Sequence, residues 1–266
     1  MATRSIEDPE AVVDRTPIPH LSHSRISRYL TCPEQYRLYY IERLRPRIDS
    51  ASLVFGTVMH VAIADLFRTG EDPVEHFRRD WQTLKDVQLR YKHRESWEAF
   101  NAKGVQLLQK FVDEEAPKIR QVLGVEQKFD LRATMLDSPF IGSIDLVAEM
   151  NDRTTVIDFK TAGSDYDDHE AALSDQLTAY VLAEPSARQV ALCVLVKTKD
   201  PRIEWHFAER NGDHLAEYLK KVRMVADDIA AGKFYKRTGK HCSYCDFLPV
   251  CLGDEKKAQE TLVRIT

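Results

Sequence analysis

A twenty-residue stretch from position 141 to position 160 constrains the possible fold more than any other part of the chain. It holds two runs of apolar and β-branched residues around a short polar break, a pattern that predicts a β-hairpin. Asn151 and Asp152 suit the turn, because both residue types tolerate a left-handed backbone. If an even-numbered turn is centred on this pair, Asp145 lies directly opposite Asp158 on the neighbouring strand.

Two carboxylates that face each other across a hairpin, with Cβ atoms about 5 Å apart, destabilise the sheet unless something compensates their charge. A divalent cation is the usual compensation, and oxygen ligands favour Mg²⁺ or Mn²⁺. Lys160 shares a strand face with Asp158, so it could orient a water molecule or stabilise a phosphate. The alternative is a solvated hairpin without chemistry, because the Asp-x-Lys tripeptide alone is common.

Further segments show the periodicities of helices and strands in an order that predicts an α/β fold. The apolar segment 55–67 predicts a buried helix that ends at Gly70, and His60 within it could simply be a core residue. Two amphipathic helices, divided near 94–96, are expected over 73–123 as a helical insertion or cap. The other expected helices cover 21–43, with a break near Cys32 and Pro33, 170–183 and 212–231, and the other strands cover 125–132, 189–197 and 202–208.

A single domain over residues 21–266 is expected, since a chain of 266 residues can bury one large core. Residues 1–20 are expected to form a flexible polar leader, because they lack the apolar segment of a secretory signal. The sequence also lacks an apolar run of about 18 residues, so no membrane span is expected. We therefore expect a cytoplasmic, unsecreted protein.

The five cysteines divide into one that fits a core and four that suit a metal. Cys193 lies in an apolar strand, whereas Cys32 stands far upstream of the trio Cys242, Cys245 and Cys251. Without a secretory signal, metal binding is a better interpretation than disulfides. The split of one plus three favours a four-cysteine iron–sulfur cluster over zinc, which usually takes two close pairs. Zinc and free thiols remain alternatives, with His241 as a substitute ligand.

Basic and aromatic residues gather in two places although the net charge of the chain is −4. Six arginines and four tyrosines interleave over 25–47, and three lysines, an arginine, a phenylalanine and a tyrosine gather over 233–240. Such mixtures suit a single nucleic-acid strand, with charges along the phosphates and rings against the bases. The alternative is solvated helix faces whose tyrosines pack inward. The net charge argues against a general nucleic-acid coat.

Four motifs follow one another in a recognisable order. They are Gly56-x3-His60, Gly142-x2-Asp145, Asp158-x-Lys160-Thr161 and Gln176-x3-Tyr180. In this order they resemble the RecB-like branch of the PD-(D/E)XK nuclease superfamily, over about residues 21–251. With the four cysteines, the chain is most similar to the iron–sulfur members of that branch. These are the AddB nuclease domain, the iron–sulfur helicase–nucleases of replication and the stand-alone nucleases of CRISPR spacer acquisition.

The resemblance implies a fold and a set of site residues. The fold is a restriction-endonuclease-like core, a central mixed β-sheet flanked by helices. A [4Fe-4S] cluster on the four cysteines staples the Cys32 region to residues 233–253. The implied site consists of the metal ligands His60, Asp145, Asp158 and the backbone carbonyl of Phe159, the catalytic Lys160, Gln176 and Tyr180, which contact DNA or support the lysine, and Glu126 as a further acidic group.

The implied activity is that of a Mg²⁺- or Mn²⁺-dependent exonuclease acting on single-stranded DNA or DNA ends in recombination, repair or CRISPR adaptation. A non-catalytic DNA-end-binding or recruitment subunit with the same fold is the alternative, and a zinc-stapled RNA-processing factor is a third interpretation. Because the chain lacks a Walker-type phosphate loop, we expect autonomy or a separate helicase, recombinase or integrase partner, and no membrane partner.

Overall fold

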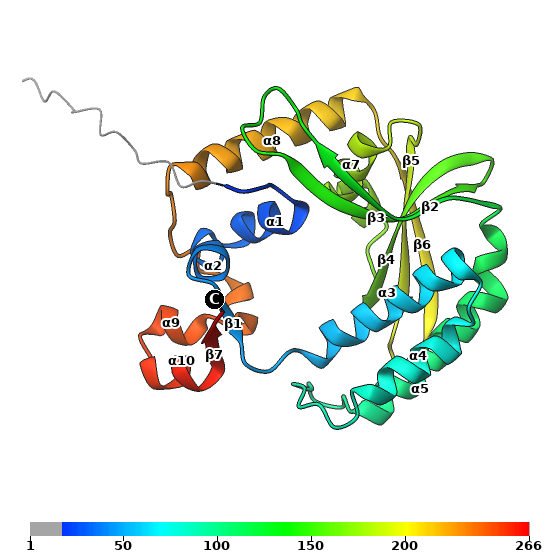
Figure 1. Ribbon diagram of the computed structural model, residues 1–266, viewed down its shortest axis with the longest axis horizontal. Coiled ribbons are helices and arrows are strands. Elements are labelled where there is room, and N and C mark those ends of the chain that lie inside the picture. The colour runs from blue at the N-terminus through cyan, green and yellow to red at the C-terminus, as the bar shows by residue number, and fades with distance from the viewer. Residues whose placement is uncertain (1–17, 266) are drawn as a thin grey trace, which may run out of the picture.

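The computed structural model describes residues 18–265 and has a mixed β-sheet at its centre (Figure 1). The sheet has five strands in the order β2-β3-β4-β5-β6, and only the β4–β5 pair is parallel. The predicted α/β fold with a mixed sheet flanked by helices is therefore confirmed. The sheet strands are β2 (Gln121–Leu131), β3 (Phe140–Met150), β4 (Arg153–Ala162), β5 (Gln189–Val196) and β6 (Arg202–Glu209).

Helices cover both faces of this sheet, and a smaller two-stranded sheet joins β1 (Leu44–Pro46) to β7 (Leu262–Arg264). The helices are α1 (His23–Thr31), α2 (Pro33–Tyr36), α3 (Ala51–Thr69), α4 (Pro73–Thr83), α5 (Trp97–Lys110), α6 (Glu170–Leu173), α7 (Asp175–Ala183), α8 (Gly212–Ala230), α9 (Leu248–Leu252) and α10 (Glu255–Thr261). π-Helical turns cover Arg37–Ile41 and Phe111–Glu115, and 3₁₀ turns cover Ala116–Lys118 and Lys240–Tyr244.

The hairpin between β3 and β4 has the predicted turn and register. Asn151 and Asp152 adopt φ angles of 53° and 58°, the left-handed conformation that such a turn requires. The ladder runs from the Met150–Arg153 pair to the Leu146–Ile157 pair and ends there. Beyond it, the carboxylate of Asp145 accepts a hydrogen bond of 2.9 Å from the backbone N–H of Phe159. A side chain thus continues the pairing where the backbone ladder stops.

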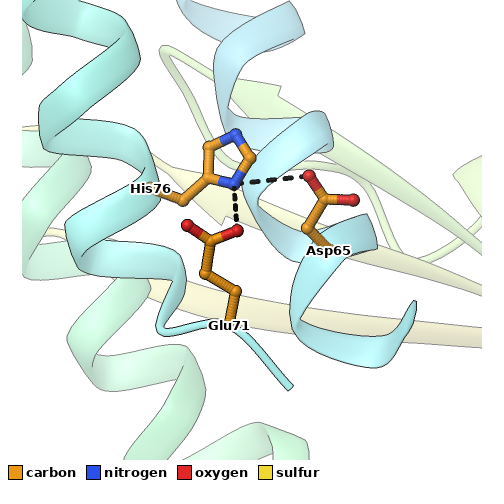
Figure 2. A group of neighbouring side chains, drawn as sticks. All are labelled: Asp65, Glu71 and His76. Atoms are coloured by element: carbon orange, nitrogen blue, oxygen red, sulfur yellow. Dashed lines mark ion pairs between the residues drawn. The ribbon is translucent and has the colours of Figure 1, made fainter. Parts of the chain in front are cut away.

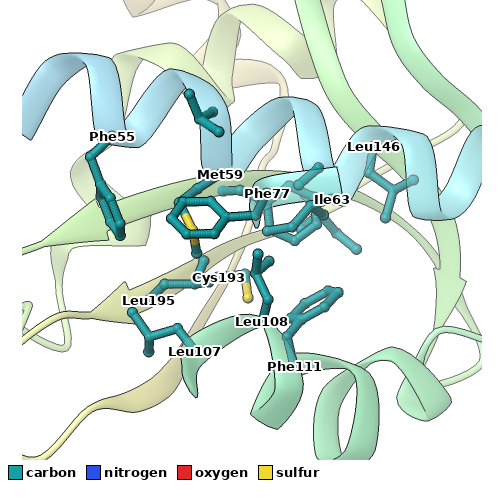
Figure 3. Close-up of a cluster of buried hydrophobic side chains, with 14 of the residues drawn as sticks. Phe55, Met59, Ile63, Phe77, Leu107, Leu108, Phe111, Leu146, Cys193 and Leu195 are labelled. Atoms are coloured by element: carbon teal, nitrogen blue, oxygen red, sulfur yellow. The ribbon is translucent and has the colours of Figure 1, made fainter. Parts of the chain in front are cut away.

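One face of the sheet packs against α3, α4 and α5. Phe55, Met59 and Ile63, one turn apart on α3, are fully buried in this cluster (Figure 3). Within residues 18–265, α3 alone is long and apolar enough to cross a membrane by composition. Its packing against the sheet accounts for that composition, because a core helix needs the same residues. Cys193 is buried in this cluster, as predicted.

The opposite face of the sheet packs against α6 and α7, and α8 continues this layer toward α1. A single helix over 170–183 was the wrong prediction, because Ser174 interrupts it. The buried guanidinium of Arg210 donates hydrogen bonds to the carbonyls of Ala171 and Ser174 and to the Thr178 hydroxyl. These bonds stabilise the break, and the Ser174 hydroxyl then caps α7.

The structure differs from the sequence-based expectations in two further ways. Helix was predicted through Leu123, but β2 begins at Gln121. Helix α10 and strand β7 had no predicted counterpart, since short terminal elements carry weak periodicity. Most of the predicted leader over residues 1–20 lies outside the described residues, and the Ile18 carbonyl accepts a hydrogen bond from Ser138.

Gly104 offers a test of the packing between α4 and α5. A Cβ atom at this position would lie 2.2 Å from the buried ring of Phe77. We expect Gly104→Ala to lower the free energy of unfolding by about 1 to 2 kcal/mol, because overpacking outweighs the helix-propensity gain of about 1 kcal/mol. Gly163→Ala, where a Cβ meets nothing within 4 Å, should change it little. Urea unfolding of both variants checks this, and equal stabilities would contradict it.

Candidate active site

A hollow of about 590 Å³ lies between α3 and the adjoining edges of β2, β3 and β4. Helix α3 approaches β4 closely at Gly56, where a Cβ atom would lie 3.1 Å from the Thr161 hydroxyl. This approach lets His60, one turn further along α3, face the sheet. The polar residues that line the hollow include Thr57, His60, Arg68, Glu126, Asp145, Lys160 and Thr161.

Asp145 carries the most strongly perturbed carboxyl group of the hollow. Its Oδ2 accepts the Phe159 N–H and lies 3.4 Å from Nδ1 of His60. Burial and the nearby negative charge of Asp158 raise the pKa of Asp145 to about 8, although the Phe159 N–H and the Lys160 charge oppose this. Two ionised carboxylates at this depth therefore repel each other when no cation lies between them.

Asp158, Lys160, Gln176 and Tyr180 form a closed ring of polar contacts between β4 and α7. Nζ of Lys160 lies 2.7 Å from Asp158 Oδ2 and donates a 2.8 Å hydrogen bond to Oε1 of the Gln176 side chain. The Gln176 amide donates to the Tyr180 hydroxyl, which in turn donates to Asp158 Oδ1 at 3.5 Å. These contacts hold the Lys160 ammonium between Asp158 and Gln176.

The charges in this ring reinforce one another. Burial alone would lower the pKa of Lys160, but the Asp158 carboxylate beside it raises that pKa overall. Burial and the two aspartates also raise the pKa of Tyr180, so its hydroxyl keeps its proton. Asp158 is 1% exposed, and its Oδ2 forms the ion pair without accepting a well-aligned hydrogen bond. Apart from that ion pair, this oxygen has no hydrogen-bond partner among the described residues.

Glu126 enters the hollow from a strained position on β2. Its φ angle is 48°, a left-handed conformation that costs a residue with a side chain about 1 to 3 kcal/mol. It lies between the ladder pairs Val125–Leu146 and Gln127–Ile144, opposite Asp145. Ser143 donates a hydrogen bond of 3.1 Å to its carboxylate. Its negative charge contributes to the raised pKa of Asp145.

His60 faces both aspartates from α3. Burial lowers the pKa of His60, while the Asp158 charge and a hydrogen bond to the Phe159 backbone partly oppose this effect. The imidazole is therefore neutral near pH 7, which is the form that binds metal ions. The structure thus brings His60, Asp145, Asp158, Phe159 and Lys160 close together.

The donor set fits a divalent cation. His60, Asp145 and Glu126 line one hollow, and the buried carboxylate of Asp158 pairs with Lys160, which lines the same hollow. Oxygen ligands with one imidazole are typical of Mn²⁺ and Mg²⁺ sites. A cation here would offset the repulsion that raises the pKa of Asp145.

His23, at the start of α1, was missed by the sequence motifs. Burial and the positive charge of Lys160 lower its pKa, whereas the charges of Asp175 and Asp158 raise it. Its Nδ1 atom is buried without a hydrogen-bond partner among the described residues. Tyr166 also lies near the ring, and burial raises its pKa against the effect of Lys160. Neither residue belongs to a recognisable motif, so sequence spacing could not identify them.

The four predicted cysteine ligands line a second, smaller cavity of about 220 Å³. Cys32 lies at the junction of α1 and α2 and lines this cavity. Close to it, the backbone N–H of Glu34 donates a hydrogen bond of 3.0 Å to the Tyr235 carbonyl in the C-terminal segment. The Gln35 amide donates to the Cys245 sulfur at 3.5 Å. Among residues 18–265, no three cysteine sulfurs come within 4.8 Å of one another. Sulfurs around one tetrahedral zinc ion would be about 3.8 Å apart.

The first basic and aromatic segment lines the largest hollow described, of about 710 Å³, beside α1, α2 and β1. The Arg25 guanidinium lies 4.1 Å from the centre of the Tyr40 ring, and those of Arg28 and Arg45 lie 3.8 and 3.4 Å from the Tyr39 ring. Side chains of the second basic segment, residues 233–240, form hydrogen bonds within the protein. Lys236 donates to the Cys251 carbonyl and Arg237 to the Leu30 carbonyl.

Comparison with known proteins identifies the family. The family model of the PD-(D/E)XK nuclease superfamily matches residues 20–252. No curated protein matches the chain. A crystal structure of a "putative exonuclease" from Eubacterium rectale aligns with a TM-score of 0.53 and 11% identity over 85% of this chain and 87% of the other.

A second solved structure, of a protein named SSO0001, has a TM-score of 0.37 and 16% identity over 73% of this chain and 82% of the other, which is too low to define a shared fold. The match of the superfamily model spans most of the chain, including the hollow and its carboxylates. The chain therefore belongs to the PD-(D/E)XK nuclease superfamily.

Proposed function

We propose that this protein is a divalent-cation-dependent deoxyribonuclease that acts as an exonuclease on single-stranded DNA or DNA ends. The observation that carries the proposal is the buried pair Asp145 and Asp158 beside Lys160, with Asp145 and Lys160 lining one hollow. Membership of a nuclease superfamily supports phosphodiester hydrolysis at this site. The exonuclease description of the Eubacterium rectale protein supports action at DNA ends.

His60, Asp145, Asp158 and the backbone carbonyl of Phe159 would hold the cation, with Glu126 as a further acidic group nearby. When bound, such a cation polarises the phosphoryl oxygens, acidifies a water molecule and neutralises charge on the leaving oxygen. Roles for the protein groups follow from their contacts. The neutral imidazole of His60 offers a lone pair, and the Phe159 N–H orients the Asp145 carboxylate toward the hollow.

Lys160 is the positive group of the site. Its ammonium has three hydrogens: Oε1 of the Gln176 side chain accepts one, and the ion pair with Asp158 Oδ2, 2.7 Å away, uses a second. The remaining hydrogen can bind the attacking water or a phosphate oxygen in the hollow. Gln176 and Tyr180 do not need to touch the substrate for this function, because their hydrogen bonds already restrict the lysine. We assign them a positioning role.

A nucleic-acid strand would reach the site along the basic and aromatic hollow beside α1, α2 and β1. Arginines stacked on tyrosine rings combine a positive edge with an apolar face, which suits phosphates and bases together. Because the stacking orders the arginines before binding, a strand would bind with a smaller loss of side-chain entropy.

We also propose a [4Fe-4S] cluster on Cys32, Cys242, Cys245 and Cys251. The cavity that the four cysteine side chains share supports it, and so does their split of one plus three in the sequence. The cluster would tie α1 and α2 to the chain beyond α8. Cross-linking positions so distant in sequence restricts the unfolded chain by several kcal/mol.

Substitution of the central residues tests the activity. We expect Asp145→Asn and Lys160→Met to lower the rate of Mn²⁺-dependent cleavage of labelled single-stranded DNA by roughly 10³-fold or more, while DNA affinity changes little. Lys220→Met, an exposed lysine on α8, is the matched control and should keep full activity. Wild-type rates in either site variant would remove the assignment. Loss of cleavage on circular or end-blocked DNA would identify exonuclease action.

The raised pKa of Asp145 gives a stability prediction for the cation-free protein. Its pKa is about 8 in the folded chain, against about 3.9 in an unfolded one. Between these values the folded state binds a proton that the unfolded state does not, so the free energy of unfolding falls as pH rises from about 4 to about 8.

With a chelator present to keep the protein free of cations, the substitution Asp145→Asn should remove this pH dependence of the free energy of unfolding. We expect it to be more stable than wild type by on the order of 2 kcal/mol at pH 8, and by much less at pH 5. Urea unfolding at both pH values measures the difference. Glu217→Gln, on the exposed face of α8, should follow the wild type. The prediction is wrong if Asp145→Asn is the less stable protein at pH 8.

The cluster proposal predicts which segments loosen when iron is removed. Cys32→Ser should lose iron and visible absorbance, and limited proteolysis should then cut both terminal segments while the central sheet stays resistant. Cys193→Ala should retain iron, because Cys193 lies fully buried in another part of the core. Unchanged protease resistance of the ends after iron loss would contradict the staple.

A further inference from the structure

A second group of metal-ligating side chains lies where α3 turns into α4. Asp65 near the end of α3, Glu71 in the connecting turn and His76 on α4 each offer one ligand atom, and these atoms all lie within 4.8 Å of one another (Figure 2). Gly70, with φ 77°, and Asp72, which caps α4 through the Val74 N–H, define the turn that presents Glu71. None of these residues belongs to the nuclease motifs.

The imidazole of His76 is oriented from behind by a carboxylate. His76 is 5% exposed, and its Nε2 lies 3.0 Å from Oδ2 of Asp80, one turn further along α4. A carboxylate can only accept, so the proton of the ring lies on Nε2. A carboxylate on the outer nitrogen is typical of histidines that bind metal ions with the other nitrogen, because it fixes the tautomer and the ring orientation.

The inner nitrogen then faces two more carboxylates. Nδ1 of His76 lies 3.3 Å from Asp65 Oδ2 and 3.4 Å from Glu71 Oε2, yet it is buried without a hydrogen-bond partner. Ligand atoms about 2.1 Å from a tetrahedral zinc ion lie about 3.4 Å from one another, which is the separation seen on both sides of this nitrogen.

Two arginines hold the outer oxygens of the carboxylates. Arg68 donates to Asp65 Oδ1 at 2.5 Å, and Arg79 donates to Glu71 Oε1 at 2.7 Å. These contacts leave the inner oxygens, Oδ2 and Oε2, directed toward His76. Three electron-pair donors thus converge on one point with their outer partners already in place, an arrangement that is repulsive unless a cation lies at the centre.

We propose that Asp65, Glu71 and His76 bind a structural Zn²⁺ ion, with Asp80 as the outer partner of the imidazole. The spacing of 3.3 and 3.4 Å between the donor atoms suits a tetrahedral Zn²⁺ ion better than Mg²⁺, which demands octahedral geometry. The ion fastens the end of α3 to the start of α4. Because Arg68 also lines the catalytic hollow, the same ion holds that side chain in place.

Zinc counting separates this site from the other metal sites of the chain. Metal-free protein is dialysed against Zn²⁺, and bound zinc per chain is measured by elemental analysis in wild type, Glu71→Gln, His76→Gln and Glu75→Gln. Both site variants should bind about one ion fewer than wild type. Glu75 lies on the same helix but is exposed and paired with Arg78, so Glu75→Gln should lose none. Equal counts in all four proteins would overturn the proposal.

Thermal unfolding distinguishes a bound ion from a protonated histidine paired with its neighbours. With Zn²⁺ about a hundredfold above its Kd, the rise in Tm of wild type should exceed that of Glu71→Gln by about 5 °C or more. In a chelator, Glu71→Gln should be as stable as wild type, because its loss relieves repulsion. A variant that is equally destabilised with and without Zn²⁺ would mean an ion pair. If His76→Gln fails to fold, the half-exposed Glu71→Gln carries both measurements.

Discussion

The burial of two neighbouring carboxyl groups, Asp145 and Asp158, is the constraint on which the rest of this structure depends. Asp145 and Asp158 lie where the β3–β4 ladder ends, and burial together with the charge of Asp158 raises the pKa of Asp145 to about 8. Such a pair persists only if its surroundings fix it. Lys160 neutralises one carboxylate, the Phe159 N–H binds the other, and α3 closes over both with His60.

Much of this arrangement follows from local pattern. The turn residues Asn151 and Asp152 determine the hairpin register, and that register puts Asp145 and Asp158 side by side. The spacing from Gln176 to Tyr180 puts both on one face of α7, where Gln176 reaches Lys160 and Tyr180 reaches Asp158. Periodicity and turn chemistry are short-range properties, so a single sequence contains them.

Other features depend on partners that are distant in the chain, and sequence pattern could not predict them. Ser174 breaks the expected helix because Arg210 binds its carbonyl and that of Ala171. Glu126 adopts a left-handed backbone inside a strand, where alternation alone predicts regular structure. His23 reaches the neighbourhood of Lys160 only through the packing of α1 against the α7 and α8 layer. In each case a tertiary contact overrides a local preference.

The Arg210 contacts also affect what natural sequence variants of this protein can be expected to do. The Arg210 guanidinium, which lies outside the hollow, determines where α7 begins. It thereby determines the position of Gln176 in the first turn of α7, and through Gln176 the position of the Lys160 ammonium. In a screen of natural variants, a substitution of Arg210 would therefore have the same effect as a substitution in the active site itself. Distance from the scissile bond is a poor guide to tolerance in this layer of the molecule.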